Sequence, residues 1–140
     1  MVRFLDSSVF LHAYLRPSRA LTQQERAVKQ SAAEIIGRVE KGEKVVTSVV
    51  HLAETLNIVE ARLGVQEALK FLENILTLGN LEIEGVTREG LEAAMAIASR
   101  FSVSANDALA FLTARRVGAE GIYSFNRHFD NLPDLERISK

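Results

Sequence analysis

The chain has 140 residues, with 17 Lys and Arg against 18 Asp and Glu for a net charge of −1, and it contains no cysteine. This length suits one domain with a substantial buried core. The balanced charge excludes a general basic field for nucleic acid, so a polyanion would need a local patch or bound cations. The lack of cysteine excludes disulfides, zinc–thiolate sites and thiol nucleophiles, and it fits a reducing cytoplasm.

No targeting or membrane segment is expected. No apolar run approaches the ~18 residues of a membrane span, and the N-terminal residues have a strand pattern rather than that of a signal peptide. No linker, repeat or low-complexity tract divides the sequence. We therefore predict a single cytoplasmic domain over residues 1–140.

Strand and helix patterns alternate along the chain, and Thr22 and Glu25 have the spacing of a capping box. Strands are expected near 2–5, 44–47, 81–84 and 121–124, and helices near 7–14, 22–40, 48–62, 65–77, 87–100 and 104–117. This order predicts an α/β fold with a mostly parallel sheet covered on both faces by helices.

Asp6 ends the first hydrophobic run and is followed at once by a helical pattern. That position places its carboxylate at the carboxyl edge of the sheet, where open α/β folds build their sites. Asp is also a common cap of a helix that follows a strand. Both roles fit the pattern of residues.

Glu54 stands early in the helix expected near 48–62, with Val50 and Ile58 beside it at i−4 and i+4. A carboxylate flanked by aliphatic side chains is not typical of a solubilising surface group. Glu60 competes for the same role, but it lies roughly 9 Å further along the helix and so further from the sheet edge. We predict that Glu54 faces the site.

Asp107 falls in the first turn of the helix expected near 104–117. Ser104 and Asp107 match the Ser-x-x-acid capping pattern, so Asp107 could simply bind the backbone amide of Ser104. The same position directs the carboxylate to the edge that holds Asp6. The two roles can coexist.

Asn126 follows the last predicted strand, at the place of a strand-end ligand. A neutral amide is a weaker ligand for a hard cation than a carboxylate, and Asn126 could instead cap a short turn. Asp130 could supply the missing charge through a water. His12, His51 and His128 lack metal-ligand spacing and are interpreted as surface or packing residues.

Carboxylates gathered at one sheet edge predict a site for a divalent cation. Mg²⁺ takes one or two carboxylates together with waters and substrate phosphate oxygens. Carboxylates in one cleft repel each other without metal, and a divalent cation removes this repulsion. Asp6 and Asp107 are the predicted direct ligands, and Glu54 is a ligand or the base that orients the attacking water.

Four segments share an order and spacing that span nearly the whole chain: Phe4–Val9, Thr47–Glu54, Ser104–Leu109 and Tyr123–Phe129. Together they resemble the PIN-domain ribonucleases, particularly the VapC-type toxins of prokaryotic toxin–antitoxin pairs. The resemblance implies a three-layer α/β/α sandwich whose acidic cluster binds Mg²⁺ or Mn²⁺ and cleaves RNA. It also implies a cognate antitoxin protein as partner and a homodimer.

Position by position, Asp6, Glu54 and Asp107 correspond to the family's first three acids, and Ser124 to the hydroxyl residue of its last strand. Asn126 stands where many members have a fourth acid. This departure bears on a second metal ion more than on the fold or the first metal ion. The resemblance thus implies an endoribonuclease with Asp6, Glu54 and Asp107 as catalytic residues.

Two alternatives remain at this stage. A catalytically impaired PIN-like domain that binds RNA or protein would explain Asn126 and the absence of net positive charge. The opening strand and Asp6 also resemble haloacid-dehalogenase phosphatases, which use the Asp as a covalent nucleophile. Those enzymes need a second acid two residues later, where this chain has Ser8.

The helices near 22–40, 48–62 and 65–77 contain more apolar residues than a small domain easily buries. Some are expected to form a dimer seam and a groove for an antitoxin segment, and the alternative is that all face the core. The residues concerned are Leu21, Val28, Ile35, Ile36, Val39, Leu69, Phe71, Leu72, Ile75 and Leu76.

Overall fold

The computed structural model describes residues 2–140 as alternating strands and helices. The strands are β1 (Arg3–Leu5), β2 (Val45–Ser48), β3 (Leu81–Glu84), β4 (Gly121–Tyr123) and β5 (Glu136–Ile138). The helices are α1 (Ser7–Tyr14), α2 (Gln23–Glu40), α3 (Val49–Leu63), α4 (Val65–Leu76), α5 (Arg88–Phe101) and α6 (Ala105–Arg116), and a 3₁₀ turn, η1, spans Arg127–Asn131.

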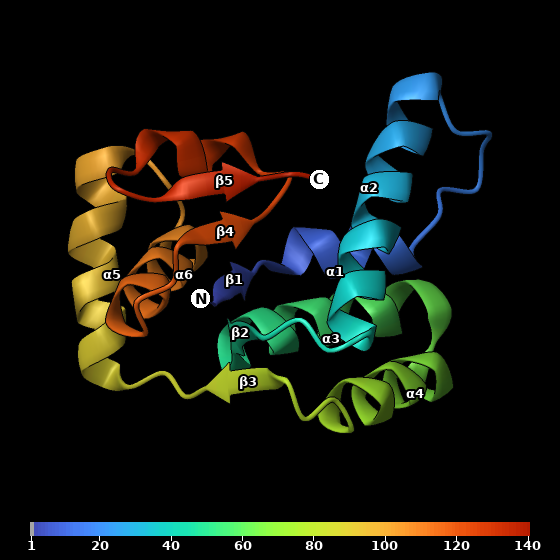
Figure 1. Cartoon of the computed structure of the whole chain (residues 1–140), viewed down its shortest axis with the longest axis horizontal. Coiled ribbons are helices and arrows are strands. Elements are labelled where there is room, and N and C mark those ends of the chain that lie inside the picture. Colours follow the sequence, from blue (N-terminus) through green and yellow to red (C-terminus); the bar gives the residue numbers. More distant parts are fainter. Residues whose placement is uncertain (1) are drawn as a thin grey trace.

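The strands form one sheet in the order β3-β2-β1-β4-β5, and every neighbouring pair is parallel. Strand β1 lies at the centre, with Arg3 opposite Val45 of β2 on one side and Gly121 of β4 on the other. The carboxyl ends of these three strands therefore meet at one edge of the sheet (Figure 1). Residues that follow β1, β2 and β4 are brought together there.

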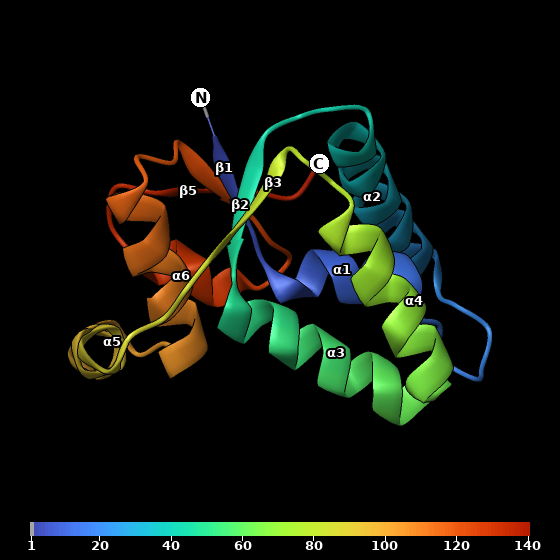
Figure 2. The same ribbon diagram turned by 90° about the horizontal axis from the view of Figure 1, so that it is seen from below.

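Helices cover both faces of the sheet. Helices α5 and α6 lie on one side and α1, α2 and α4 on the other, while α3 runs outward from the end of β2 (Figures 1 and 2). One core joins Leu5 and Tyr123 to α1, α2 and α4, and a second joins Phe4, Val46 and Ile122 to α6. The predicted three-layer α/β/α sandwich is confirmed.

The predicted helices agree with the structure to within one residue at each end. Four residues predicted to start helices are N-caps, and each side chain accepts a hydrogen bond from the backbone amide three residues on: Thr22, Ser48, Thr87 and Ser104. The sequence pattern missed β5. Among residues 2–140, no helix is both long enough and apolar enough to cross a membrane.

Candidate active site

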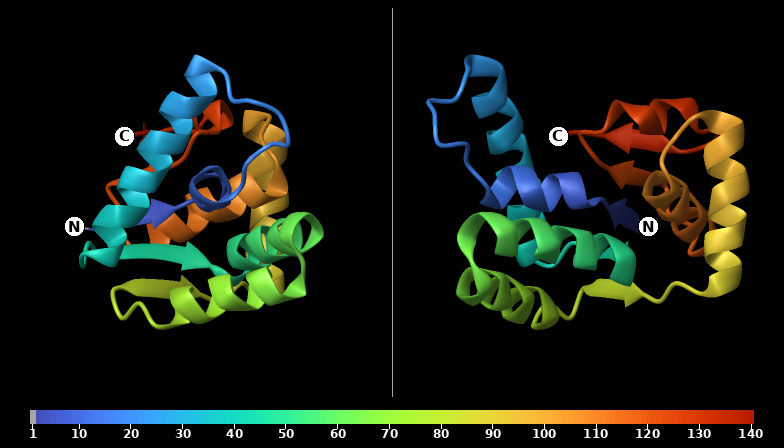
Figure 3. Two further views of the ribbon diagram at one scale, coloured as in Figure 1. Left: turned by 90° about the vertical axis from the view of Figure 1, so that its right-hand side faces the viewer. Right: turned by 180° about the vertical axis from the view of Figure 1, so that it is seen from behind.

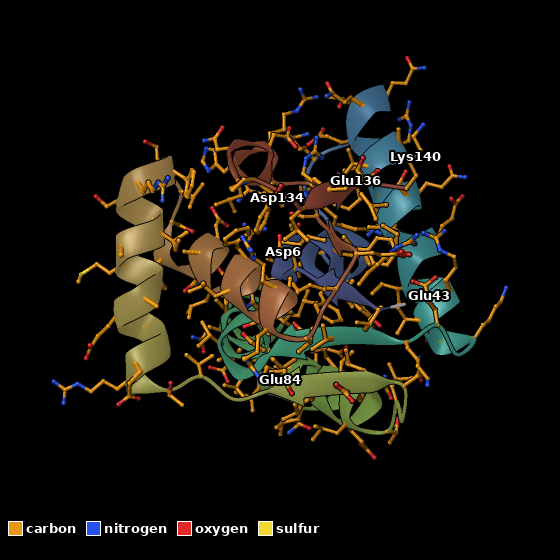
Figure 4. The ribbon with its side chains drawn as sticks, turned by 60° about the vertical axis from the view of Figure 1, so that its left-hand side comes forward. Asp6, Glu43, Glu84, Asp134, Glu136 and Lys140 are labelled. Carbon is orange, nitrogen blue, oxygen red and sulfur yellow. The ribbon has the colours of Figure 1, made fainter. Side chains whose placement is uncertain are left out.

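A cleft of about 470 Å³ opens at the carboxyl edge of β1. Its lining residues are Asp6, Ser7, Ser8, Leu11, Glu54, Ser104, Ala105, Asn106, Asp107 and Asn126. Asp6 lies near the centre of the molecule, between α1 and α6 (Figure 4). The structure thus brings the three predicted acids and Asn126 into one cleft, and Glu60, Ser124 and Asp130 are not part of its lining.

Asp6 is a buried carboxylate held by two hydroxyl groups. It stands at the N-cap position of α1, yet its side chain makes no capping hydrogen bond. Instead, Ser8 Oγ and Ser124 Oγ donate to Asp6 Oδ2 over 2.8 and 2.7 Å. Asp6 Oδ1 accepts no hydrogen bond from residues 2–140, so this oxygen is available to a cation.

Glu54 is half-buried on α3, and Ser7 Oγ donates to its Oε1 over 2.6 Å. This bond fixes the carboxylate against the first turn of α1 and leaves Oε2 without a hydrogen bond from residues 2–140. Glu60 is exposed further along the same helix. The geometry favours Glu54 over Glu60 as the cleft residue of α3.

Asp107 caps its helix and lines the cleft at the same time. It forms both bonds of a capping box, since Ser104 Oγ accepts from Asp107 N and Asp107 Oδ2 accepts from Ser104 N over 3.0 and 3.3 Å. Its side chain is nevertheless buried, and this burial raises the pKa of Asp107, with a further contribution from the charge of Asp6. The two roles anticipated for this position do coexist.

The amide of Asn126 has a defined orientation. Because the backbone N–H of His128 can only donate, its partner at 3.0 Å is Asn126 Oδ1, and this bond caps η1. Asn126 Nδ2 then donates to Asp107 Oδ1 over 3.1 Å. In this arrangement Asn126 supplies a hydrogen-bond donor to Asp107 rather than an oxygen to a cation.

Asp130 does not reach the cleft. It is exposed and pairs with Arg137, whose Nε lies 3.0 Å from Asp130 Oδ1. The hydrogen bond from Arg137 lowers the pKa of Asp130 below its usual range. Asp130 therefore forms an ion pair with a residue of β5 at the surface.

Sequence reasoning missed three residues that contact the acids: Ser7, Ser8 and His51. The hydroxyls follow Asp6 directly, but serines in that place also fit an ordinary helix start. His51 was interpreted as a surface or packing residue; it is buried, and its Nε2 lies 4.0 Å from Asp6 Oδ1. The aliphatic residues around it in the sequence gave no signal of this contact.

The other two histidines lie nearer the surface. His12 is exposed and packs edge-on against Phe125. His128 is exposed, with Nδ1 3.8 Å from Asp107 Oδ2. Neither replaces a carboxylate in the cleft.

The donor atoms in the cleft suit a hard divalent cation. Within residues 2–140, no group of three or more His, Cys, Asp or Glu side chains is spaced as a preformed metal cage. Mg²⁺ does not require one, because it is bound through one or two carboxylates and keeps waters and substrate oxygens. Asp6 and Asp107 can supply such carboxylates, and Mn²⁺ accepts the same oxygen ligands.

Comparison with solved structures gives two likenesses over the whole chain. The toxin VapC20 of Mycobacterium tuberculosis, described as cleaving the sarcin-ricin loop, superposes with a TM-score of 0.75 at 22% identity, covering 100% of both chains. A chain of VapBC2 from Rickettsia felis, bound to a DNA fragment from its promoter, gives a TM-score of 0.66 at 17% identity, covering 99% of this chain and 98% of that one. At these identities the likeness shows a shared fold.

Sequence comparison identifies the family. No curated protein matches the chain. The family model of the PIN domain matches residues 3–135, which include every strand but β5 and every carboxylate of the cleft. The chain therefore belongs to the PIN-domain family.

Proposed function

We propose that the protein is a divalent-metal-dependent endoribonuclease and the toxin of a type II toxin–antitoxin pair. The observation that carries this proposal is the meeting of Asp6, Glu54 and Asp107 in one cleft of a PIN domain. Family membership supports a nuclease in general. The sarcin-ricin loop activity described for VapC20 supports RNA as the substrate class.

In this proposal the acids divide the work of hydrolysis. Asp6, through Oδ1, and Asp107 would hold Mg²⁺ or Mn²⁺. A bound cation of this kind lowers the pKa of water and neutralises charge on the phosphate. Glu54 Oε2 would accept the proton of the attacking water while Ser7 holds Oε1. As the water oxygen bonds to phosphorus, the P–O bond to the leaving nucleotide breaks, and the leaving oxygen keeps the bonding electron pair and takes a proton from solvent.

Two serines hold the carboxylate of Asp6 in position for this chemistry. Ser8 and Ser124 both donate to Asp6 Oδ2, which prevents the carboxylate from rotating. A ligand held in this way meets the metal with little reorganisation. In this proposal Ser124 supports Asp6 and does not bind the metal itself. Asn126 and Asp130 are not metal ligands.

A catalytically impaired domain that binds RNA or protein is the second candidate. Asn126 favours this candidate, because it stands where the resemblance implies a fourth acid. Its neutral amide donates a hydrogen bond to Asp107 Oδ1 and adds no negative charge to the cleft. Metal-dependent turnover separates the two candidates, because an impaired domain would bind its partner without cleaving RNA.

The deciding experiment is RNA cleavage with Mg²⁺, Mn²⁺ or EDTA, using wild type and Asp6→Asn. The variant should stay folded, because Ser8 and Ser124 can still donate to the amide oxygen. Its activity should fall by more than the roughly 10–100-fold loss that is typical when a residue supporting a metal ligand is replaced. Thermal melting monitors the fold. Full activity of Asp6→Asn would refute the metal assignment, and a folded wild type without cleavage would favour the impaired domain.

Glu54→Gln and Glu60→Gln form a matched pair on one helix. The first should abolish turnover because the amide cannot accept the proton of the water, whereas the second should leave it nearly intact because Glu60 is exposed outside the cleft. Initial rates on the same RNA measure both. The opposite ranking would assign the catalytic role to Glu60.

An antitoxin partner belongs to the same proposal. A groove of about 560 Å³ adjoins the cleft at Leu11 and is lined by both apolar and charged residues of α1, α2, α3, the segment between α1 and α2, and the segment after β4. Its apolar residues include Leu15, Leu21, Val28, Ile58 and Phe125. An apolar antitoxin segment would fill it and direct a basic side chain at the acids, blocking metal and RNA together. The complex formed by VapBC2 supports a partner of this kind.

Copurification from the native host tests this partner. A small protein that suppresses cleavage should accompany the wild type, and Val28→Glu should release it while leaving RNA cleavage unchanged, because Val28 lines the groove and not the cleft. A nuclease that purifies without any inhibitor would contradict the antitoxin and leave the nuclease intact.

A further inference from the structure

We propose that His51 is a positioning residue of the cleft, whose imidazole ties the first turn of α6 to α3 and thereby sets Asp107 relative to Asp6 and Glu54. The link to metal binding and catalysis rests on the proposed nuclease function. The link between the helices rests on geometry alone.

His51 is fully enclosed, and both of its ring nitrogens have partners. It lies in the first turn of α3 with 1% of its surface exposed, and its ring packs edge-on against Phe4 with centroids 5.0 Å apart. Nδ1 lies 2.6 Å from Ser48 Oγ, and Nε2 lies 3.0 Å from the backbone oxygen of Asn106. The imidazole therefore has one fixed orientation.

The identity of these partners places a hydrogen on Nε2. The carbonyl of Asn106 can only accept, so Nε2 donates to it. Ser48 Oγ accepts the backbone N–H of His51 over 3.2 Å, and the same hydroxyl can either donate to Nδ1 or accept from it. A protonated Nε2 excludes this nitrogen as a metal ligand.

The hydrogen bond between His51 and Asn106 connects two helices that line the cleft. Within residues 2–140, it is the one hydrogen bond or ion pair between α3 and α6. Helix α3 carries Glu54, and Asn106 directly precedes Asp107. The same Nε2 lies 4.0 Å from Asp6 Oδ1. One imidazole thus contacts or lies beside all three chain segments that carry the acids.

A purely structural role for His51 makes a different prediction. If His51 only fills the core, its replacement lowers stability and leaves the spacing of the acids unchanged. Thr55 provides the matched control, because it is fully buried one turn further along α3 and its Oγ1 donates to the carbonyl of His51 within the same helix. Thr55→Val removes a buried hydrogen bond without touching α6.

The variants His51→Gln and His51→Asn separate reach from polarity. A Gln amide can place a donor near the position of Nε2, whereas an Asn amide is too short to reach Asn106. We expect Mn²⁺ affinity, measured by titration calorimetry, to fall roughly 10–100-fold in His51→Asn, as for other residues that orient ligands. Affinity should be largely retained in His51→Gln and unchanged in Thr55→Val, even where Thr55→Val melts earlier.

RNA cleavage adds a kinetic readout to the same variants. In His51→Asn, kcat should fall while KM changes little, because the acids are misplaced and the RNA surface is intact. A His51→Asn protein that melts early yet binds Mn²⁺ as wild type does would overturn the proposal. Equal loss of Mn²⁺ affinity in Thr55→Val would overturn it too.

Nuclear magnetic resonance of the metal-free protein keeps the test independent of nuclease function. Long-range proton–nitrogen correlation near neutral pH should show a hydrogen on His51 Nε2. The backbone amide of Asp107 should shift in His51→Asn and stay in place in Thr55→Val. An Nε2 without a hydrogen, or an unmoved Asp107 amide, would refute the link even if RNA cleavage is confirmed, whereas both signals without any cleavage would refute only the proposed nuclease.

Discussion

Asp107 illustrates how one carboxylate serves both a helix and a cleft. Its Oδ2 accepts Ser104 N and its Oδ1 accepts the amide of Asn126, while burial raises its pKa. Metal binding requires the ionised carboxylate, so protons and cation compete for this group. A raised pKa moves that competition to higher pH than at an ordinary aspartate.

The expected result is a fall in Mn²⁺ affinity that begins at a higher pH than the ordinary aspartate pKa of ~3.9 would give. Ionising Asp107 also costs folding free energy above its raised folded-state pKa, and this cost is lost as pH falls below the unfolded value. Mn²⁺ titrations and melts between roughly pH 7.5 and 3.5, a range that includes this reference pKa, measure the two effects. An affinity that stays flat until the ordinary value would contradict the assignment of Asp107 as a ligand.

Asn126→Asp replaces the donor to Asp107 Oδ1 with a second negative charge. Without metal, like charges in contact should lower the melting temperature, and a bound cation should relieve the repulsion, so Mn²⁺ should bind more tightly and raise the melting temperature more than in wild type. Melts in EDTA and in Mn²⁺ measure this difference.

Asn57→Asp is the control for that variant, because it adds the same charge at an exposed position of α3. If both variants respond equally to Mn²⁺, position 126 has no influence on the site.

The residues of the cleft differ in how far the sequence could reveal them. Asp6, Glu54 and Asp107 follow from their places at a strand end, in the second turn of α3 and in the first turn of α6, although their roles stay predictions. Ser7 and His51 could not be inferred, because their partners lie 47 and 55 residues away in the sequence and a local pattern contains no such contact.

At the scale of elements, local signals gave the helices and failed at the last strand. The starts of α2, α3, α5 and α6 each have one capping side chain bound to the amide three residues on, and a single sequence shows this pattern directly. Strand β5 has three residues, of which only Ile138 is apolar, and it lies at the edge of the sheet. Strand β5 forms because it pairs with β4, and the residues of β5 alone do not indicate this pairing.

Gly121 makes that pairing possible. A Cβ at this position would lie 2.8 Å from the backbone oxygen of Glu136 and from Ile138 Cδ1, so β5 packs against a strand with no side chain there. Gly121→Ala should force β5 away and destabilise the protein by roughly 1–3 kcal/mol, as overpacking does. Urea unfolding measures the change in free energy.

Gly79→Ala is the matched control, since a Cβ there would meet no atom within 4 Å. It should be neutral or stabilise by about 0.4–1 kcal/mol through the unfolded chain. Equal destabilisation by both substitutions would show that the approach of β5 to Gly121 is not the cause.

For the whole molecule, the apolar residues of α2 and α4 divide between core and surface. Half of the residues predicted for a dimer seam or groove are buried in the core and cannot contribute to a seam: Ile35, Ile36, Val39, Phe71 and Ile75. Leu69 and Leu76 are exposed at 55% and 62% and share one face of α4 with Val65. Helix α5, at the outer edge of the molecule in Figure 3, exposes Leu91 and Met95.

Because the predicted seam includes Leu69 and Leu76, α4 is the helix to test for the proposed homodimer. Leu69→Glu should convert the dimer to a monomer with little loss of stability, since the side chain is already exposed in the single chain. Met95→Glu on α5 should leave the dimer intact. Light scattering measures the mass of each, and a monomeric wild type would contradict the homodimer.

The central position of β1 has a consequence for synthesis on the ribosome. Strand β1 is made before β4, with which it pairs, and Asp6 receives its bond from Ser124 across 118 residues of sequence. Contacts between residues this far apart form late, and a nascent chain offers Asp6 no such partner until residue 124 has been synthesised. A translation product that stops before β4 should therefore lack the completed cleft.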